Sequence, residues 1–153
     1  MALRKSATRR DTLTAGALGA LALALAPRLA YADVAAVEAE IKKLYGDKKP
    51  GAGKIKLDVP QIAENGLVVP INIEVESPMT PADFVKSVHV FADGNPLPGI
   101  VSYSFTPESG KASASARMRL AQTQKIICIA EMSDGKLFSA SAEVKVTIGG
   151  CGG

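Results

Sequence analysis

The chain ends in Gly149-Gly150-Cys151-Gly152-Gly153, a single thiol between two pairs of glycines. Glycine has no side chain and leaves φ and ψ nearly free, so these residues predict a flexible arm that reaches about 16 Å and could enter a narrow channel. The tail holds no Lys, Arg or His that could stabilise a thiolate, so whatever activates the thiol must come from a partner. The pattern favours a carrier of covalently attached substrate over a self-sufficient enzyme.

Cys128 has different surroundings, because it lies within the apolar run Lys125 to Met132. A free cysteine in such a run is predicted to be a small buried hydrophobe. The alternative is a disulfide between Cys128 and Cys151, which an oxidising compartment would permit. We expect strand geometry to oppose it, because Cys151 lies about 33 Å along the strand from the residue opposite Cys128, and a disulfide needs Cα atoms within about 7 Å.

Little else in the sequence could carry catalysis. His89 is the single histidine, which excludes a metal site with several His ligands. The sequence contains no phosphate-binding glycine loop, dinucleotide motif or serine elbow, so we expect neither a cofactor nor a metal. Two rival functions stay open: a thiol enzyme that pairs Cys151 with His89, and a non-catalytic binding sandwich in which Cys151 forms only a covalent homodimer.

Residues 1–32 are typical of a cleaved bacterial export signal. Basic residues, including the pair Arg9-Arg10, precede the apolar run Leu13 to Ala26, and Ala30-Tyr31-Ala32 is a small-x-small cleavage site. The arginine pair resembles the twin-arginine signal, which exports folded proteins, and the general export route is the alternative. The apolar run is shorter than the about 20 residues of a membrane span. We therefore expect a periplasmic protein without a membrane anchor.

Most of the excess positive charge belongs to this signal. Residues 1–32 hold five Lys or Arg and one acid, so the 18 basic and 15 acidic residues of the chain become 13 and 14 after cleavage, a net charge of −1. The sequence has no basic stripe or set of stacking aromatics, and it gives no support to nucleic-acid binding.

The rest of the chain is predicted to form a short helix followed by an all-β domain. Apolar residues at three- and four-residue spacing predict a helix from Val34 to Tyr45 within a helix-and-linker segment, residues 33–54. Seven runs separated by turn residues predict an immunoglobulin-like antiparallel β-sandwich over residues 55–148, with the arm at 149–153. The predicted strands are Ile55 to Val59, Leu67 to Val75, Val85 to Phe91, Ile100 to Phe105, Ala112 to Leu120, Lys125 to Met132 and Leu137 to Ile148.

The register of the last hairpin is also predictable. A three-residue loop of Ser133-Asp134-Gly135, with Gly135 in the left-handed position, pairs Cys128 with Ala140. A two-residue Asp-Gly turn would pair Cys128 with Ser141 instead, and the apolar match between the strands favours the longer loop.

Several short segments together carry a resemblance to a known family. The most specific segment is Val146-Thr147-Ile148-Gly149-Gly150-Cys151-Gly152-Gly153; the others are Ile62-Ala63-Glu64-Asn65-Gly66, Ser77-Pro78-Met79-Thr80, Asn95-Pro96, Arg117-Met118-Arg119-Leu120-Ala121 and Ser133-Asp134-Gly135. With these segments the chain resembles the SoxY family, the sulfur-substrate carriers of the Sox pathway of thiosulfate oxidation. The resemblance covers most of residues 55–153, and Cys128 is not part of the family's motif.

The resemblance implies that Cys151 carries thiosulfate-derived sulfur between enzymes. A haem enzyme would load thiosulfate oxidatively, a hydrolase would release sulfate, and a sulfur dehydrogenase would oxidise the sulfur that remains. The resemblance also implies a stable heterodimer with a SoxZ-type subunit. That subunit would cover an apolar, strand-rich face of the sandwich, and without it the chain would self-associate.

Overall fold

The structure, a computed structural model, describes residues 32–150. The predicted signal, apart from Ala32, lies outside this range. Cys151, Gly152 and Gly153 also lie outside it, and so do the predictions that concern them.

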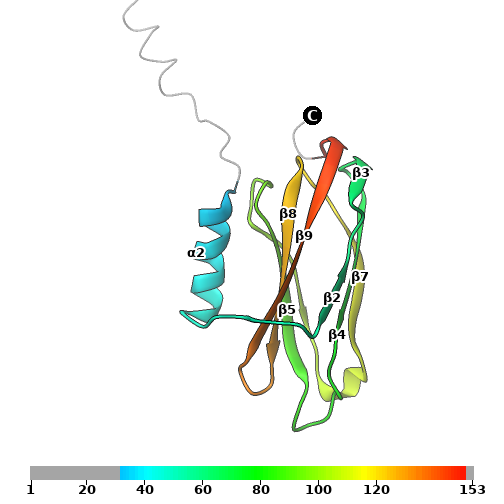
Figure 1. The fold of residues 1–153 in the computed structure, drawn as a ribbon. Coiled ribbons are helices and arrows are strands. Elements are labelled where there is room, and N and C mark those ends of the chain that lie inside the picture. The colour runs from blue at the N-terminus through cyan, green and yellow to red at the C-terminus, as the bar shows by residue number, and fades with distance from the viewer. Residues whose placement is uncertain (1–31, 151–153) are drawn as a thin grey trace, which may run out of the picture.

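Two β-sheets face each other across one hydrophobic core (Figure 1). The larger sheet has the strand order β1-β9-β8-β5-β6, with β3 paired to β9, and the smaller sheet has the order β2-β4-β7. This arrangement confirms the predicted sandwich with a short amino-terminal helix. The described elements are α2 (Val34–Tyr45), β1 (Gly51–Ala52), β2 (Ile55–Asp58), β3 (Ile62–Asn65), β4 (Val69–Val75), β5 (Val85–Ala92), β6 (Gly99–Ser104), the 3-10 helix η1 (Pro107–Ser109), β7 (Ala112–Met118), β8 (Gln124–Met132) and β9 (Leu137–Ile148).

Helix α2 has the bounds that the sequence predicts. The Asp33 carboxylate accepts a hydrogen bond from the amide of Ala36 at 2.8 Å and caps the amino end. Gly46, with φ of 69°, ends the helix. The helix lies against the outer face of the larger sheet, beside β5 and β8 (Figure 1). The apolar residues that hold it there are Val37, Tyr45, Phe91, Ile129 and Leu137.

Nowhere in residues 32–150 is there a helix long and apolar enough to cross a membrane.

The β8–β9 hairpin adopts the predicted register. Gly135 has φ of 80°, and its amide donates to the carbonyl of Met132 at 2.9 Å. The amide of Met132 in turn donates to the carbonyl of Lys136 at 2.9 Å. Cys128 consequently lies opposite Ala140, which confirms the three-residue loop.

Strand β3 is a feature that the sequence analysis did not predict. It runs parallel to the end of β9, with Ile62 opposite Lys145 and Asn65 opposite Ile148. Ala63 is its one buried residue, so the segment lacks the alternation that identifies a strand. Leu67, where we predicted a strand to begin, lies in the turn after β3, and β4 begins at Val69.

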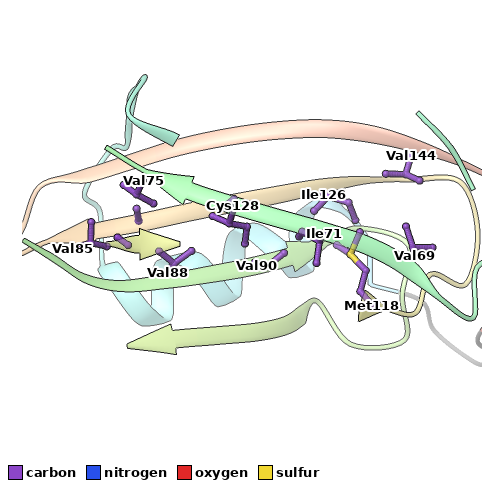
Figure 2. Close-up of a cluster of buried hydrophobic side chains, with 14 of the residues drawn as sticks. Val69, Ile71, Val75, Val85, Val88, Val90, Met118, Ile126, Cys128 and Val144 are labelled. Atoms are coloured by element: carbon purple, nitrogen blue, oxygen red, sulfur yellow. The ribbon is translucent and has the colours of Figure 1, made fainter. Parts of the chain in front are cut away.

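Inward-facing side chains of the two sheets form the core (Figure 2). Burial alternates along β4, as it should on a strand with one face toward the core. Cys128 lies among these side chains with an exposed fraction of 0%, which confirms its predicted burial. Figure 2 labels Val69, Ile71, Val75 and Met118 from the smaller sheet, and Val85, Val88, Val90, Ile126, Cys128 and Val144 from the larger sheet.

Candidate functional site

The candidate site begins where β9 ends, beside β3 (Figure 1). Two backbone hydrogen bonds join this end of the chain to two distant segments, and a third joins those segments to each other. The amide of Gly66 donates to the carbonyl of Ile148 at 2.7 Å, and the amide of Leu120 donates to the carbonyl of Gly66 at 2.8 Å. The amide of Gly150 then donates to the carbonyl of Leu120 at 2.8 Å. The last two described residues are thus part of the folded domain.

The packing around these residues leaves no room for side chains. A Cβ added at Gly149 would overlap the carbonyl oxygen of Ala121. One added at Gly150 would overlap the backbone of Gly66, and one added at Gly66 would overlap the carbonyl oxygen of Leu120. Glycine is required at these places because backbones approach one another closely.

This packing corrects part of the predicted arm. We expected the chain to be free from Gly149 onward, but Gly149 and Gly150 are held against the domain. Sequence reasoning missed the contact because it treated both glycines only as sources of flexibility. The Asn65-Gly66 pair is typical of a tight turn, but a turn sequence does not identify a distant partner. Cys151 follows Gly150 directly in the sequence.

Cys128 offers no accessible thiol. Burial raises its pKa to about 12, so the reactive thiolate form is strongly disfavoured. Among the described residues it has no disulfide partner. Ala140 lies opposite it on β9, and the run from Ala140 to Ile148 spans about 26 Å at about 3.3 Å per residue.

His89 lies under helix α2 and far from the arm. Its Nδ1 and the hydroxyl of Tyr45 form a hydrogen bond, and the two rings meet edge to face with centroids 5.6 Å apart. Burial lowers the pKa of His89 from its ordinary value, although the charge of Glu131 opposes the shift. His89 is level with Ile129 and Ser139 in the sheet, about 30 Å from Ile148 along β9. The structure therefore does not bring this histidine to the arm.

Among residues 32–150, no three His, Cys, Asp or Glu side chains cluster in a way that could hold a metal ion.

The fold and this site define a β-sandwich whose candidate site lies at the end of β9, directly before Cys151 in the sequence. A family comparison matches Sulfur oxidation protein SoxY over residues 41–151. The chain belongs to the SoxY family. This assigns it to the carriers of sulfur oxidation and not to the enzymes of that process.

One solved structure agrees with this assignment, and others share the fold. The structure of the sulfur carrier protein SoxY from Chlorobium limicola f thiosulfatophilum matches with a TM-score of 0.64 and 29% identity, over 76% of this chain and 100% of that chain. A superoxide reductase (neelaredoxin) from Ignicoccus hospitalis matches with a TM-score of 0.56 and 16% identity, over 61% and 80%. A superoxide reductase from Nanoarchaeum equitans matches with a TM-score of 0.52 and 17% identity, over 63% and 98%. These two similarities concern the fold alone. No curated protein sequence matches the chain.

Proposed function

We propose that the chain is a covalent carrier of sulfur intermediates in thiosulfate oxidation, with the cargo attached to the thiol of Cys151. The observation that carries the proposal is the SoxY family match, which extends to residue 151. The structure supports it by elimination, because the other thiol of the chain, Cys128, is fully buried with a raised pKa. Cys151 is thus the cysteine with the chemistry that a carrier needs.

The proposed loading step is an oxidation. The Cys151 thiol and thiosulfate form an S–S bond, giving a cysteine S-thiosulfonate, one proton and two electrons, which a partner haem enzyme accepts. Water then cleaves the terminal sulfonate as sulfate and leaves a persulfide on the cysteine, and a sulfur dehydrogenase oxidises that remaining sulfur. Sulfur–sulfur bonds form and break at a thiolate, so a bare cysteine suits this cargo.

A tethered cargo has a physical advantage over a free one. Attachment replaces repeated capture of a small anion from dilute solution with delivery at high effective concentration. His89, the histidine that a thiol enzyme would need beside Cys151, is bonded to Tyr45 on another face. The chemistry is accordingly assigned to partner enzymes, and this chain supplies the thiol and its placement.

Location and permanent partner are part of the same proposal. The sequence of residues 1–32 supports export to the periplasm, by the twin-arginine route if the pair Arg9-Arg10 acts as that signal. Family membership supports a SoxZ-type subunit as the stable partner. A folded heterodimer could then cross the membrane on one signal.

Replacement of the cysteine tests the proposal in cells. We expect Cys151→Ser to abolish thiosulfate-dependent oxygen uptake and to leave the fold and the partner complex intact, since the hydroxyl forms no bond to sulfur under these conditions. Cys128→Ser is the matched control and should keep uptake. Undiminished uptake with Cys151→Ser would disprove the carrier role. Gels run with and without reductant would then test the rival covalent homodimer.

A further inference from the structure

The contacts that hold Gly149 and Gly150 lie directly before the proposed cargo cysteine in the sequence. They come from the β3–β4 turn at Gly66 and from the loop at residues 119–121, which the side chain of Asn95 holds in place. We propose that these segments, called here the arm clamp, position Cys151 for the partner enzymes, with Asn95 as the central positioning residue. The inference rests on the proposed carrier function.

The first part of the clamp is a chain of backbone bonds. Gly66 donates to Ile148 and accepts from Leu120, and Leu120 accepts from Gly150. Each of the three segments is therefore bonded to both of the others. Loss of any one bond exposes the next to competition from water, so the clamp should open as a unit.

The second part is the side chain of Asn95, which is 9% exposed. Its Nδ2 donates to the carbonyl of Arg119 at 2.9 Å, and its Oδ1 accepts from the amide of Ala121 at 3.0 Å. One side chain thus fixes the residues on both sides of Leu120. The carbonyls of Leu120 and Ala121 are the groups that contact Gly150 and Gly149, so Asn95 acts on the arm through this loop.

Gln124 braces Asn95 from the strand that follows the loop. Its Nε2 donates to Oδ1 of Asn95 at 2.8 Å, and its Oε1 accepts from the amide of Gly94 at 2.8 Å. Asn95 and Gln124 are the buried polar residues of the described chain, and none of their buried side-chain atoms lacks a partner. A fully bonded buried network of this kind specifies one arrangement of the loop.

The consequence for the arm is geometric. Consecutive Cα atoms are about 3.8 Å apart, so a fixed Gly150 fixes the position from which Cys151 starts. A partner enzyme then does not have to order Gly149 and Gly150. Each backbone residue that is already ordered lowers the conformational cost of docking. A clamped arm should therefore bind an enzyme channel more tightly than a free one.

Glycine substitutions separate this role from simple folding. Gly149→Ala adds a Cβ that overlaps the carbonyl oxygen of Ala121, at the end of the chain where the core is not involved. Gly99→Ala is the matched control, because a Cβ there has no atom within 4 Å and its φ is not positive. Asn95→Asp is a second variant, which keeps the acceptor for Ala121 but loses the donor to Arg119 and adds a buried charge.

Two measurements on the full-length carrier with its partner subunit test whether the arm clamp positions Cys151. The first is the KM and kcat of the loading haem enzyme for the carrier with thiosulfate. The second is the electron paramagnetic resonance spectrum of a methanethiosulfonate nitroxide on Cys151, a reagent that the buried Cys128 should not meet. The rate of Cys151 alkylation by iodoacetamide serves as the control for thiol reactivity.

We expect Gly149→Ala and Asn95→Asp to raise KM about tenfold with kcat within about twofold, because docking must now order further backbone residues. Their nitroxide spectra should become narrower, the alkylation rate should not fall, and Gly99→Ala should match the wild type. Unchanged KM and spectra in folded Gly149→Ala and Asn95→Asp proteins would overturn the clamp. A lowered KM would overturn it too, because the contacts would then hide the thiol.

The nitroxide measurement also keeps the clamp separate from the carrier proposal. If wild-type Cys151 acquires no sulfur cargo, the proposed function fails, and the spectra still report whether the clamp holds the arm.

Discussion

Because Cys128 is buried, we expect it to contribute to the stability of the fold and not to sulfur transfer. Its side chain is 0% exposed, and burial raises the pKa of its thiol to about 12. Cys128→Ser should lower the free energy of unfolding by about 1–3 kcal/mol, because a buried hydroxyl without a partner costs that much. Urea unfolding measures the loss, and thiosulfate-dependent uptake should persist. A stably folded Cys128→Ser protein without activity would mean that this thiol has a role in sulfur transfer.

His89 should make the protein less stable in acid. Its pKa is lowered mainly by burial, so between its ordinary value of about 6.5 and the lower folded value the unfolded chain binds more protons than the native one. Stability is therefore complete above about pH 6.5 and declines as the pH falls toward the folded pKa. Protonation also leaves both ring nitrogens of His89 as donors, so Nδ1 can then only donate to the Tyr45 hydroxyl.

The pH effect can be isolated by substitution. His89→Gln keeps an acceptor for the Tyr45 hydroxyl and does not titrate. The groups that face His89 are the hydroxyl of Tyr45 and the carboxylate of Glu131, and the latter is paired with Lys86 at 3.4 Å. Melting temperatures from pH 7 to pH 5 should fall more steeply for the wild type than for His89→Gln. Parallel curves would assign the acid sensitivity to other groups.

At the scale of elements, the two halves of the glycine tail should behave differently. Gly150→Ala places a Cβ against the backbone of Gly66, so it should cost about 1 kcal/mol and lower the melting temperature by about 4 °C through lost hydrogen bonding. Gly152→Val should leave the melting temperature unchanged and slow the partner enzymes, because its side chain obstructs a narrow channel. Differential scanning calorimetry and enzyme turnover measure the two effects.

Alkylation of the same samples supplies the control for this pair. A small reagent needs no channel, so Gly152→Val should react at the wild-type rate. Equal enzyme turnover of Gly152→Val and wild type would show that the channel argument does not apply at that position.

Elements built from local signals were predictable from the sequence. The apolar spacing from Val34 to Tyr45 identifies α2, and Ser133-Asp134-Gly135 sets the β8–β9 register. Strand β3 and the packing of Gly149 and Gly150 were not predictable. Gly66 bonds to Ile148 and to Leu120, and Gly150 bonds to Leu120, so the bonded partners lie far apart in the sequence. Short or glycine segments have no apolar period from which such a partner could be inferred.

For the whole molecule, we expected an apolar, strand-rich face for the partner subunit, but the outer face of the smaller sheet is polar. The smaller sheet carries polar side chains on its outer face, including Lys56, Asn72 and Glu74. The exposed large apolar side chains lie elsewhere, because the strands bury theirs in the core. They are Val34 and Leu44 on α2, Leu97 after β5, and Ile62, Leu67, Val68 and Ile148 on β3, the turn after it and the end of β9.

We still predict a stable partner subunit, since exposed apolar groups such as Ile62 (63%) and Ile148 (67%) favour association. Sedimentation of the chain alone should give mixed oligomers, and addition of a SoxZ-type subunit should convert them to a 1:1 complex. A monodisperse monomer with no affinity for that subunit would contradict the heterodimer.

The most direct test of the carrier account is the intact mass of the protein after incubation with thiosulfate and the loading haem enzyme. The account predicts a thiosulfonate adduct that peptide mapping places on the carboxyl-terminal peptide with Cys151, and none on the peptide with Cys128. Addition of the hydrolase should release sulfate from that adduct and leave a single extra sulfur atom on Cys151. An unmodified protein, or an adduct confined to Cys128, would contradict the account.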